Sequence, residues 1–383
     1  MLTKFELKNY KNFKEKITLD LTKVGGYQFS TDCVKNNVLN KMLIYGRNAT
    51  GKTNFGLAVM DIRQIVFGNK RLADGIFLNA SSEVNFVLFS YTFQFGDNEV
   101  VYQYKRLSQS RLSGEELWID GRQIYQVDFV NKKCEFLNLS IINAETINID
   151  RYIQALDTED NLEEDSVSQI PFLRWLINNT AFDSDSVIIS LADYVLNMWM
   201  MTTGRIGGNL FTRGYDAFFE QLADKKELDK FEGFLNYMGV SCRLKVERIP
   251  DGRYELYFKY KKLVPFRESA SRGTVALLNI YRRIINIAKK STLLYLDEYD
   301  AFFHYEMAEK LIIYFKQNFP DSQMIFTTHN TSLMSNRLLR PDCLFILSEK
   351  GNLTALCDAT NRELREGHNL RKMYISGEFE EFE

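Results

Sequence analysis

Cysteine is scarce in this chain, and long hydrophobic runs are absent. Five cysteines are scattered over 383 residues without a C-x-x-C pair, a spacing that favours buried thiols over disulfides or a zinc site. No apolar run reaches the roughly 18 residues of a membrane span, and the first residues lack the apolar region of a secretory signal. We therefore expect a cytoplasmic protein without a membrane segment.

The chain also lacks a large excess of one charge, internal repeats and sustained heptads. The formal net charge is −2, so no global positive field drives nucleic-acid binding, although a local basic groove could still bind DNA. The absence of heptads excludes long coiled-coil arms. Hydrophobic residues make up 45% of the 383 residues, which is ample for one large two-lobed domain or for two domains.

A complete phosphate-loop motif, G-x-x-x-x-G-K-[ST], spans residues 46–53. Residues 41–45 predict a buried strand before it and residues 54–62 predict a helix after it, which is the context that the motif requires. The glycines let backbone N–H groups approach phosphates, Lys52 can reach the β and γ oxygens, and Thr53 can ligate Mg²⁺. The predicted nucleotide-binding residues are Gly46, Arg47, Asn48, Ala49, Thr50, Gly51, Lys52, Thr53 and Asn54.

The flanking patterns divide the chain into three segments. Alternating residues predict strands at 2–7 and 17–21 and an antiparallel meander at 83–130, and the acidic stretch 157–165 predicts a solvated loop. Further predictions are helices at 172–177, 185–200 and 216–238, a Gly-rich connection at 203–209 and a hairpin at 243–258. We expect an N-terminal ATPase lobe at 1–156, a helical insert at 157–240 and a C-terminal ATPase lobe at 241–383.

Two carboxylates follow a second apolar strand, predicted at 292–296. Asp297 can face Mg²⁺ through water, and Glu298 can activate the attacking water as a general base. Alone, such a pair could simply be a strand end that meets solvent. Because the same chain carries a phosphate loop, the catalytic interpretation is favoured.

A histidine follows the next predicted strand, at 322–328. The helix expected at 307–318 forms a crossover that returns His329 to the sheet edge of Glu298. There His329 could sense the γ-phosphate by hydrogen bonding, although a lone histidine is more often structural.

Between these motifs, residues 268–278 form a small-residue turn that opens a helix, and a helix N-terminus can bind an anion. The order phosphate loop, Ser-x-Gly-Thr turn, Asp-Glu strand and histidine strand resembles the ABC-type ATPases, which include SMC proteins and RecF. The resemblance implies an α/β ABC-type P-loop ATPase head with an antiparallel β-rich lobe and an inserted helical lobe. It also implies that Ser271, Gly273 and Thr274 act in trans on ATP bound by a second subunit. Ala270 and Arg272 depart from the usual Leu-Ser-Gly-Gly signature.

The sequence is more similar to the short ABC-like ATPases of bacterial defence systems, related to OLD proteins and to the ATPase subunits of Septu and PARIS. The matching segments are 271–274, Asp297-Glu298 with Phe303-His304, Thr328-His329-Asn330, and Ser376-Gly377-Glu378-Phe379. The resemblance implies ATP and Mg²⁺ as cofactors, catalysis by Lys52, Glu298 and His329, and metal binding by Thr53, Asp297 and the candidate glutamine Gln169. It also implies Asp300 in a loop that contacts the opposite subunit, and Lys11 or Phe13 near the nucleotide base.

Our preferred hypothesis is an ATPase that works as a homodimer or higher even oligomer and controls a separate effector nuclease in anti-phage defence. Too few residues follow His329 for the Toprim nuclease that OLD proteins carry. The alternative is a RecF-like ATPase that clamps DNA, motivated by Arg282-Arg283 and Lys289-Lys290, which are equally explained as a solvated helix face. A third is a nucleotide-gated scaffold that rarely turns over. The tail 377–383 could dock a partner, although a frayed terminus is favoured.

Overall fold

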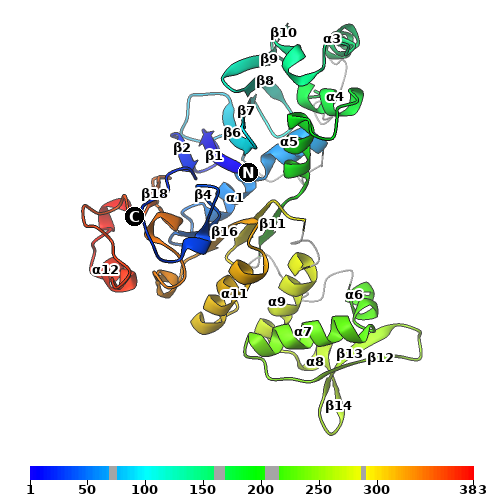
Figure 1. Ribbon diagram of the computed structural model, residues 1–383, viewed down its shortest axis with the longest axis vertical. Coiled ribbons are helices and arrows are strands. Elements are labelled where there is room, and N and C mark those ends of the chain that lie inside the picture. The colour runs from blue at the N-terminus through cyan, green and yellow to red at the C-terminus, as the bar shows by residue number, and fades with distance from the viewer. Residues whose placement is uncertain (69–75, 159–168, 203–214, 286–289) are drawn as a thin grey trace. The chain divides into compact units, whose positions relative to one another are not determined.

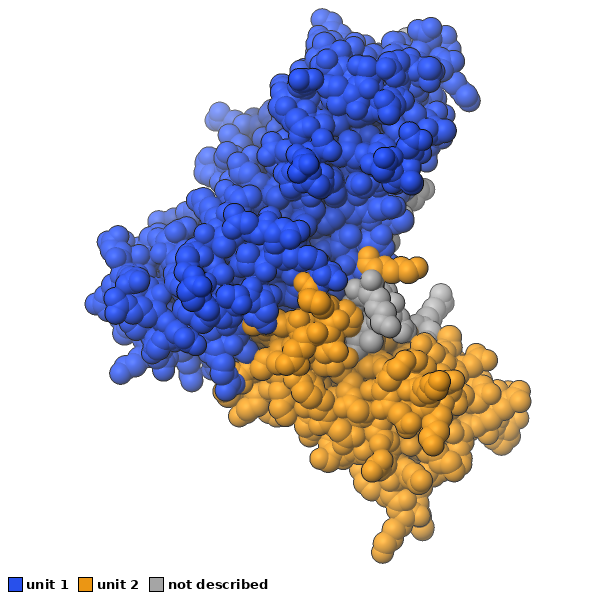
Figure 2. All heavy atoms as spheres, in the orientation of Figure 1, with its two compact units in different colours: residues 1–200, 291–295, 321–383 blue, residues 201–290, 296–320 orange. Residues whose placement is uncertain are grey.

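The computed structural model describes residues 1–68, 76–158, 169–202, 215–285 and 290–383 (Figure 1). The chain forms two compact units, coloured blue and orange in Figure 2. Unit 1 contains Met1–Met200, Ser291–Tyr295 and Asp321–Glu383, and unit 2 contains Met201–Lys290 and Leu296–Pro320. The predicted connection 203–209 lies outside the described residues. So does the predicted loop 157–165, except for its first two residues, which end helix α3 (Ile149–Thr158).

The larger sheet of unit 1 is antiparallel, with the strand order β10-β9-β8-β7-β6-β1-β2. The predicted strands 2–7 and 17–21 are β1 (Leu2–Lys8) and β2 (Ile17–Asp20), and the predicted meander is confirmed. It consists of β6 (Val87–Phe95), β7 (Asn98–Arg106), β8 (Leu112–Ile119), β9 (Arg122–Asp128) and β10 (Lys133–Phe136). Alternate aromatic residues of these strands, such as Tyr91, face the core, as the period of a half-buried strand requires.

The second sheet carries the motifs and has the order β11-β15-β16-β5-β17-β18. Strand β5 (Lys41–Tyr45) is buried throughout and lies parallel to both β16 (Gln323–Thr328) and β17 (Leu344–Leu347). The remaining strands are β11 (Met198–Thr202), β15 (Leu293–Asp297) and β18 (Leu353–Ala355), of which β18 is antiparallel to β17. Continuous apolar runs produce such strands because both faces of the sheet are covered.

Helices of unit 1 cover these sheets. They are α1 (Lys52–Val59), α2 (Asp61–Phe67), α3, α4 (Phe172–Asn179), α5 (Val187–Leu196) and α12 (Leu370–Ile375). Helix α1 joins the antiparallel sheet because Tyr91 O–H donates to Ala58 C=O at 2.8 Å and Phe5 packs on Phe55 with ring centroids 5.6 Å apart. Unit 1 also contains the short strands β3 (Val34–Lys35) and β4 (Val38–Leu39). The motif-bearing helix is thus fixed to both sheets.

Unit 2 combines helices with a small antiparallel sheet. The helices are α6 (Tyr215–Gln221), α7 (Lys225–Tyr237), α8 (Phe266–Ser269), α9 (Arg272–Ile280), the π-helical turn η4 (Tyr281–Ile285) and α11 (Tyr305–Asn318). The sheet is β12 (Leu244–Arg248), β13 (Tyr254–Lys259) and β14 (Leu263–Pro265), which confirms the predicted hairpin. Its core is aromatic: Phe231 and Tyr281 pack with ring centroids 4.9 Å apart.

Two predicted helices were wrong in their extent. The helix expected at 185–200 begins as predicted, because the Ser186 side chain accepts a hydrogen bond from Ile188 N–H at 3.3 Å, but it ends at Leu196 and β11 follows. The helix expected at 216–238 is divided into α6 and α7, because Asp224 caps α7 by accepting from Lys226 N–H at 2.7 Å. Tertiary pairing and a local cap outweighed the helical pattern.

The three predicted segments, 1–156, 157–240 and 241–383, stay a prediction. The compact units combine segments that are distant in the sequence, and α4 and α5 of the expected helical insert belong to unit 1. Within the described ranges, no helix is long and apolar enough to cross a membrane. The tail is packed rather than frayed, since Phe379 has no exposed surface.

Candidate functional site

The phosphate loop joins β5 to α1, in the predicted order of strand, loop and helix. Two of its residues have left-handed backbone conformations, Ala49 with φ of 66° and Gly51 with φ of 103°. A Cβ atom at Gly51 would lie 2.2 Å from Asn12 Nδ2, and one at Gly46 would lie 2.6 Å from Thr50 Oγ1. Both glycines are therefore required by close packing, and Gly51 also by its φ.

The Lys52 side chain hydrogen-bonds to the backbone of the loop. This side chain is 4% exposed, and its ammonium group donates to Gly46 C=O at 2.7 Å and to Arg47 C=O at 2.8 Å. Thr50 Oγ1 also donates to Arg47 C=O, at 3.0 Å. A buried ammonium group on a glycine-rich loop at a helix N-terminus fits the phosphates of a nucleotide. Arg47, Asn48 and Ala49 are exposed, whereas Thr53 and Asn54 are half-buried.

The structure brings His329 to this loop. In the parallel ladder Thr328 is opposite Tyr45, and Gly46 N–H donates to Thr328 C=O at 3.2 Å. His329 follows directly and its side chain is exposed. The next turn is fixed because Thr328 Oγ1 accepts from Asn330 N–H at 2.9 Å. The strand that carries the histidine therefore ends beside the phosphate loop. The expected approach of His329 to the sheet edge of Glu298 stays a prediction.

Strand β15 packs against the helix that follows the loop. Tyr295 O–H donates to Lys52 C=O at 2.6 Å, and a Cβ atom at Gly56 would lie 2.3 Å from the Tyr295 ring. Gly56 thus permits close approach of α1 and β15. The sequence did not reveal this requirement, because Gly56 occurs inside an ordinary helical pattern.

The predicted acidic pair ends β15 and continues into unit 2. Asp297 has no exposed surface, and Glu298 is half-buried. Glu298 has a φ of 46°, a left-handed conformation that is costly for a residue other than glycine. Its C=O accepts from Ala301 N–H at 3.0 Å, which starts a tight turn. Such strain in a residue with a candidate catalytic side chain supports a functional hypothesis.

The signature segment opens α9 in unit 2, as predicted. Ser271 is the N-cap: its Oγ accepts from Thr274 N–H at 3.1 Å and lies 2.9 Å from Thr274 Oγ1. Ser271 and Arg272 are exposed, while Thr274 is buried. A Cβ atom at Gly273 would lie 3.2 Å from Phe302 C=O, so the start of α9 lies against the turn that follows Glu298. His304 is the N-cap residue of α11.

Sequence reasoning missed Asn12. Its Nδ2 donates to Thr50 C=O at 3.0 Å, and its Oδ1 accepts from Asn54 Nδ2 at 2.8 Å. Asn12 comes from the turn between β1 and β2, where an asparagine is ordinary, so no signal in the sequence indicated its target. Phe13, predicted near the nucleotide base, is instead 1% exposed and packs on Phe55 with ring centroids 6.2 Å apart.

The predicted metal ligands are Thr53, Asp297 and Gln169, and Gln169 has a hydrogen-bond partner within the protein. Gln169 Oε1 accepts from Leu112 N–H at 2.7 Å, so its role at a metal stays a prediction. No cluster of three or more metal-ligating His, Cys, Asp or Glu side chains occurs within the part of the chain that the structure describes. A Mg²⁺ site built from the Thr53 hydroxyl, one carboxylate and phosphate oxygens needs no such cluster.

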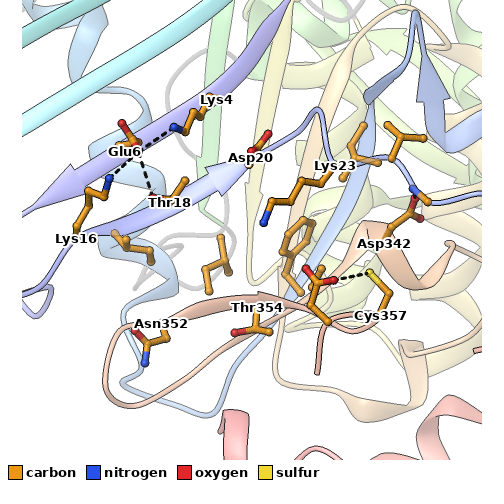
Figure 3. Close-up of a pocket in the computed structure, with 18 residues that line it drawn as sticks. Lys4, Glu6, Lys16, Thr18, Asp20, Lys23, Asp342, Asn352, Thr354 and Cys357 are labelled. Atoms are coloured by element: carbon orange, nitrogen blue, oxygen red, sulfur yellow. Dashed lines mark hydrogen bonds and ion pairs between the residues drawn. The ribbon is translucent and has the colours of Figure 1, made fainter. Parts of the chain in front are cut away.

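A separate groove of about 850 Å³ lies beside β1, β2 and β18. Figure 3 shows Lys4 and Lys16 directed at Glu6, with ion-pair distances of 3.1 and 3.0 Å. Asp342 accepts from Gly25 N–H at 2.7 Å. Several charges of the groove are thus paired with one another, and no predicted site residue lines it. The phosphate loop, and not this groove, stays the predicted nucleotide site.

The sheet order, the phosphate loop after β5 and the antiparallel lobe define an α/β P-loop ATPase head of the ABC type. The chain belongs to the protein family described as "AAA domain, putative AbiEii toxin, Type IV TA system", whose model matches residues 142–335. The matched region includes the signature segment, Asp297, Glu298 and His329, and it begins after the phosphate loop. None of the curated proteins compared with the chain matches it.

Solved structures of SMC heads are similar to the chain. One is an SMC head bound to the C-winged helix domain of ScpA, with 17% identity, coverage of 90% of this chain and 93% of that one, and a TM-score of 0.46. A second is the SMC head domain from Thermotoga maritima, with 15% identity, coverage of 92% and 98%, and a TM-score of 0.43. A third, from Pyrococcus furiosus with an extended coiled coil and bound to the C-terminal domain of ScpA, has 16% identity, coverage of 92% and 95%, and a TM-score of 0.45.

Proposed function

We propose that the chain binds ATP with Mg²⁺ and hydrolyses it, and that ATP-dependent pairing of two copies controls a partner effector. The observation that carries the proposal is the ladder in unit 1 that ends beside the phosphate loop. Thr328 C=O accepts from Gly46 N–H at 3.2 Å, so His329 directly follows a residue bonded to the loop. A loop that holds phosphates and a neighbouring histidine that can report on them suit a nucleotide-dependent switch.

Each site residue has a chemical task in this proposal. Lys52 exchanges its bonds to Gly46 and Arg47 for bonds to phosphate oxygens, and Thr53 and Asp297 hold the metal. Bound Mg²⁺ neutralises charge that develops on the transferred phosphoryl group. Glu298 accepts the proton of the attacking water, and His329 donates a hydrogen bond toward the γ-phosphate.

The signature segment supports pairing of two copies. Ser271 is an exposed residue at a helix N-terminus, where the helix dipole favours an anion. In a homodimer, or a higher even oligomer, Ser271, Gly273 and Thr274 of one copy contact the γ-phosphate held by the other. Contacts from both copies favour the closed state, and hydrolysis removes them.

The effector is proposed to be a separate chain. The family description names a toxin of a Type IV toxin–antitoxin system, which supports a role in a system of two components. Together with the motif resemblance, it supports a cytoplasmic ATPase that restrains or releases a nuclease in anti-phage defence.

The test replaces the general base. Glu298→Gln should keep ATP binding, lower hydrolysis by roughly 100-fold or more, and accumulate an ATP-bound dimer. Hydrolysis assays and light scattering after size-exclusion chromatography measure these outcomes, with Glu306→Gln at an exposed position of α11 as the control. Hydrolysis at the wild-type rate in Glu298→Gln would remove Glu298 from the mechanism.

A second candidate is the DNA clamp, and one feature of unit 2 favours it. The loop between β13 and β14 presents Tyr260, which is 64% exposed, together with the exposed Lys261 and Lys262. The residues that first suggested DNA support it less: Arg282 stacks over the Tyr215 ring at 4.3 Å, and Lys289 lies outside the described residues. The basic loop is therefore the better candidate for contact with phosphates.

ATP-dependent binding of duplex DNA that weakens with salt would favour this candidate. Lys261→Gln with Lys262→Gln should then reduce the salt slope of binding by about 2. The same double change at Lys225 and Lys226, exposed at the start of α7, is the matched control. Equal effects of the two double variants would count against the loop.

A further inference from the structure

The C-terminal motif at 376–379 has no part in the function proposed above, and the structure shows what it builds. Gly377 has φ of 84°, and the N–H groups of Gly377 and Glu378 donate to Tyr374 C=O and Met373 C=O, each at 3.1 Å. This is a Schellman end to α12. Phe379 is then fully buried, so the motif anchors the residues on either side of it.

The anchored segment holds both residues that flank Gly46. The Tyr374 ring packs edge-on against the Tyr45 ring, with centroids 4.8 Å apart. The Glu383 carboxylate forms an ion pair with the Arg47 guanidinium, and this charge raises the pKa of Arg47. Glu349 N–H donates to Glu383 C=O at 3.4 Å, which fixes the backbone of Glu383. The C-terminal segment 370–383 therefore contacts the first half of the phosphate loop.

Asn12 holds the second half of the loop. Its amide bonds to Thr50 C=O and to the Asn54 side chain, and it fills the space beside Gly51 that a Cβ atom would need. The turn that carries Asn12 is itself fixed, because Asn79 Nδ2 donates to Lys11 C=O at 2.7 Å. An amide from one segment thus bonds to the second half of the loop, and a carboxylate from another segment pairs with the first half.

We infer that Asn12 and Glu383 are positioning residues that clamp the phosphate loop in its phosphate-binding shape before a nucleotide arrives. The inference rests on the proposed function, because it concerns the same site. A loop with left-handed residues at Ala49 and Gly51 has other conformations open to it, and restricting them beforehand lowers the entropy that binding must cost. The motif at 376–379 is explained by this role, since it delivers Glu383 to Arg47.

The test measures the dissociation constant of a fluorescent ATP analogue with Mg²⁺, together with kcat for ATP. Asn12→Ala and Glu383→Arg should each weaken binding by roughly three- to tenfold, with a small change in kcat. The neutral variant Glu383→Gln, which removes the charge that pairs with Arg47 and leaves the loop itself unchanged, should weaken binding in the same direction by a smaller factor. Asn98→Ala, at the first residue of β7, and Glu381→Arg, an exposed carboxylate of the same segment as Glu383, are the matched controls.

A second readout needs no nucleotide. Hydrogen exchange at residues 46–54 of the ligand-free protein should be faster in Asn12→Ala and Glu383→Arg than in wild type, and unchanged in the controls. A wild-type protein that binds no ATP would refute the proposed function, whereas the exchange rates would still decide the clamp. Exchange at residues 46–54 that is unchanged in both Asn12→Ala and Glu383→Arg would overturn the inference.

Discussion

The phosphate loop in unit 1 and the signature segment in unit 2 are held in different ways. The loop is bonded by residues far away in the sequence, namely Asn12, Thr328 and Glu383. The signature segment is held by its own helix cap, in which Ser271 bonds to Thr274 three residues later. The loop is therefore a product of the tertiary structure, whereas the signature segment is a local structure.

The difference indicates how each region can act. A loop restrained from several sides is already shaped for a ligand, so it can bind a nucleotide within one copy of the chain. A helix start with an exposed serine and satisfied cap bonds can meet another molecule without rearranging. We therefore expect changes in the loop to alter binding, and changes in the signature segment to alter hydrolysis.

The largest expected effect is that of Lys52→Ala. Loss of charge-assisted bonds to the phosphates should weaken ATP binding by roughly 100-fold and abolish hydrolysis. Calorimetry and a phosphate-release assay measure the two quantities, with Lys350→Ala at an exposed site as the control. Normal hydrolysis in Lys52→Ala would contradict the role of the phosphate loop in binding ATP. A wild-type protein that binds ATP without turnover would instead favour a nucleotide-gated scaffold.

The next largest effect is expected from a glycine substitution in the phosphate loop, compared with one in the signature segment. Gly51→Ala should weaken ATP binding by about tenfold or more, because its φ of 103° disfavours a side chain and its Cβ atom would lie 2.2 Å from Asn12 Nδ2. Gly273→Ala should leave binding unchanged, because in the proposed function Gly273 contacts the ATP of another copy; its Cβ atom would crowd Phe302 C=O at 3.2 Å within unit 2. Titration of both variants with ATP tests the pair. The comparison would fail if Gly273→Ala were the weaker binder.

Ser271→Ala should have a smaller effect that appears in turnover. We expect unchanged ATP binding, hydrolysis lower by roughly tenfold, and a loss of about 1 kcal/mol of stability with the cap. Ser271→Thr, which keeps a capping hydroxyl, controls for folding. Mixing Ser271→Ala with Lys52→Ala should recover activity, because a mixed dimer contains one site with both wild-type residues. Absence of recovery would argue against action in trans.

The smallest effect concerns Lys41, at the start of the strand that leads to the loop. Burial lowers its pKa to about 8, and its ammonium group donates to Ser322 C=O at 2.6 Å. The unfolded chain therefore binds more protons than the folded one between pH 8 and about 10.4. The stability of wild type should rise with pH in this window relative to Lys41→Met. Thermal unfolding at several pH values measures the difference. Parallel plots of Tm against pH for wild type and Lys41→Met would contradict the prediction.

The motifs whose structure depends on neighbouring residues could be predicted from the sequence. The phosphate loop, the cap at Ser271 and the strand before Asp297 depend on near neighbours, and the structure has each in the predicted secondary structure. One helix was divided by an overlooked local cap at Asp224, and the other errors arose where distant contacts decided the structure. The residues after Leu196 pair in a sheet instead of extending a helix, and the tail is anchored by burial of Phe379.

The sequence by itself determined the phosphate loop, the acidic strand end, the histidine strand and the helix cap, because residue type and spacing within about ten positions specify them. Only the tertiary structure decided that Asn12 and Glu383 meet the same loop, and that Gly56 admits Tyr295. Those contacts join residues 38 to 336 positions apart, and their partners are determined by sheet order and packing rather than by any pattern along the chain.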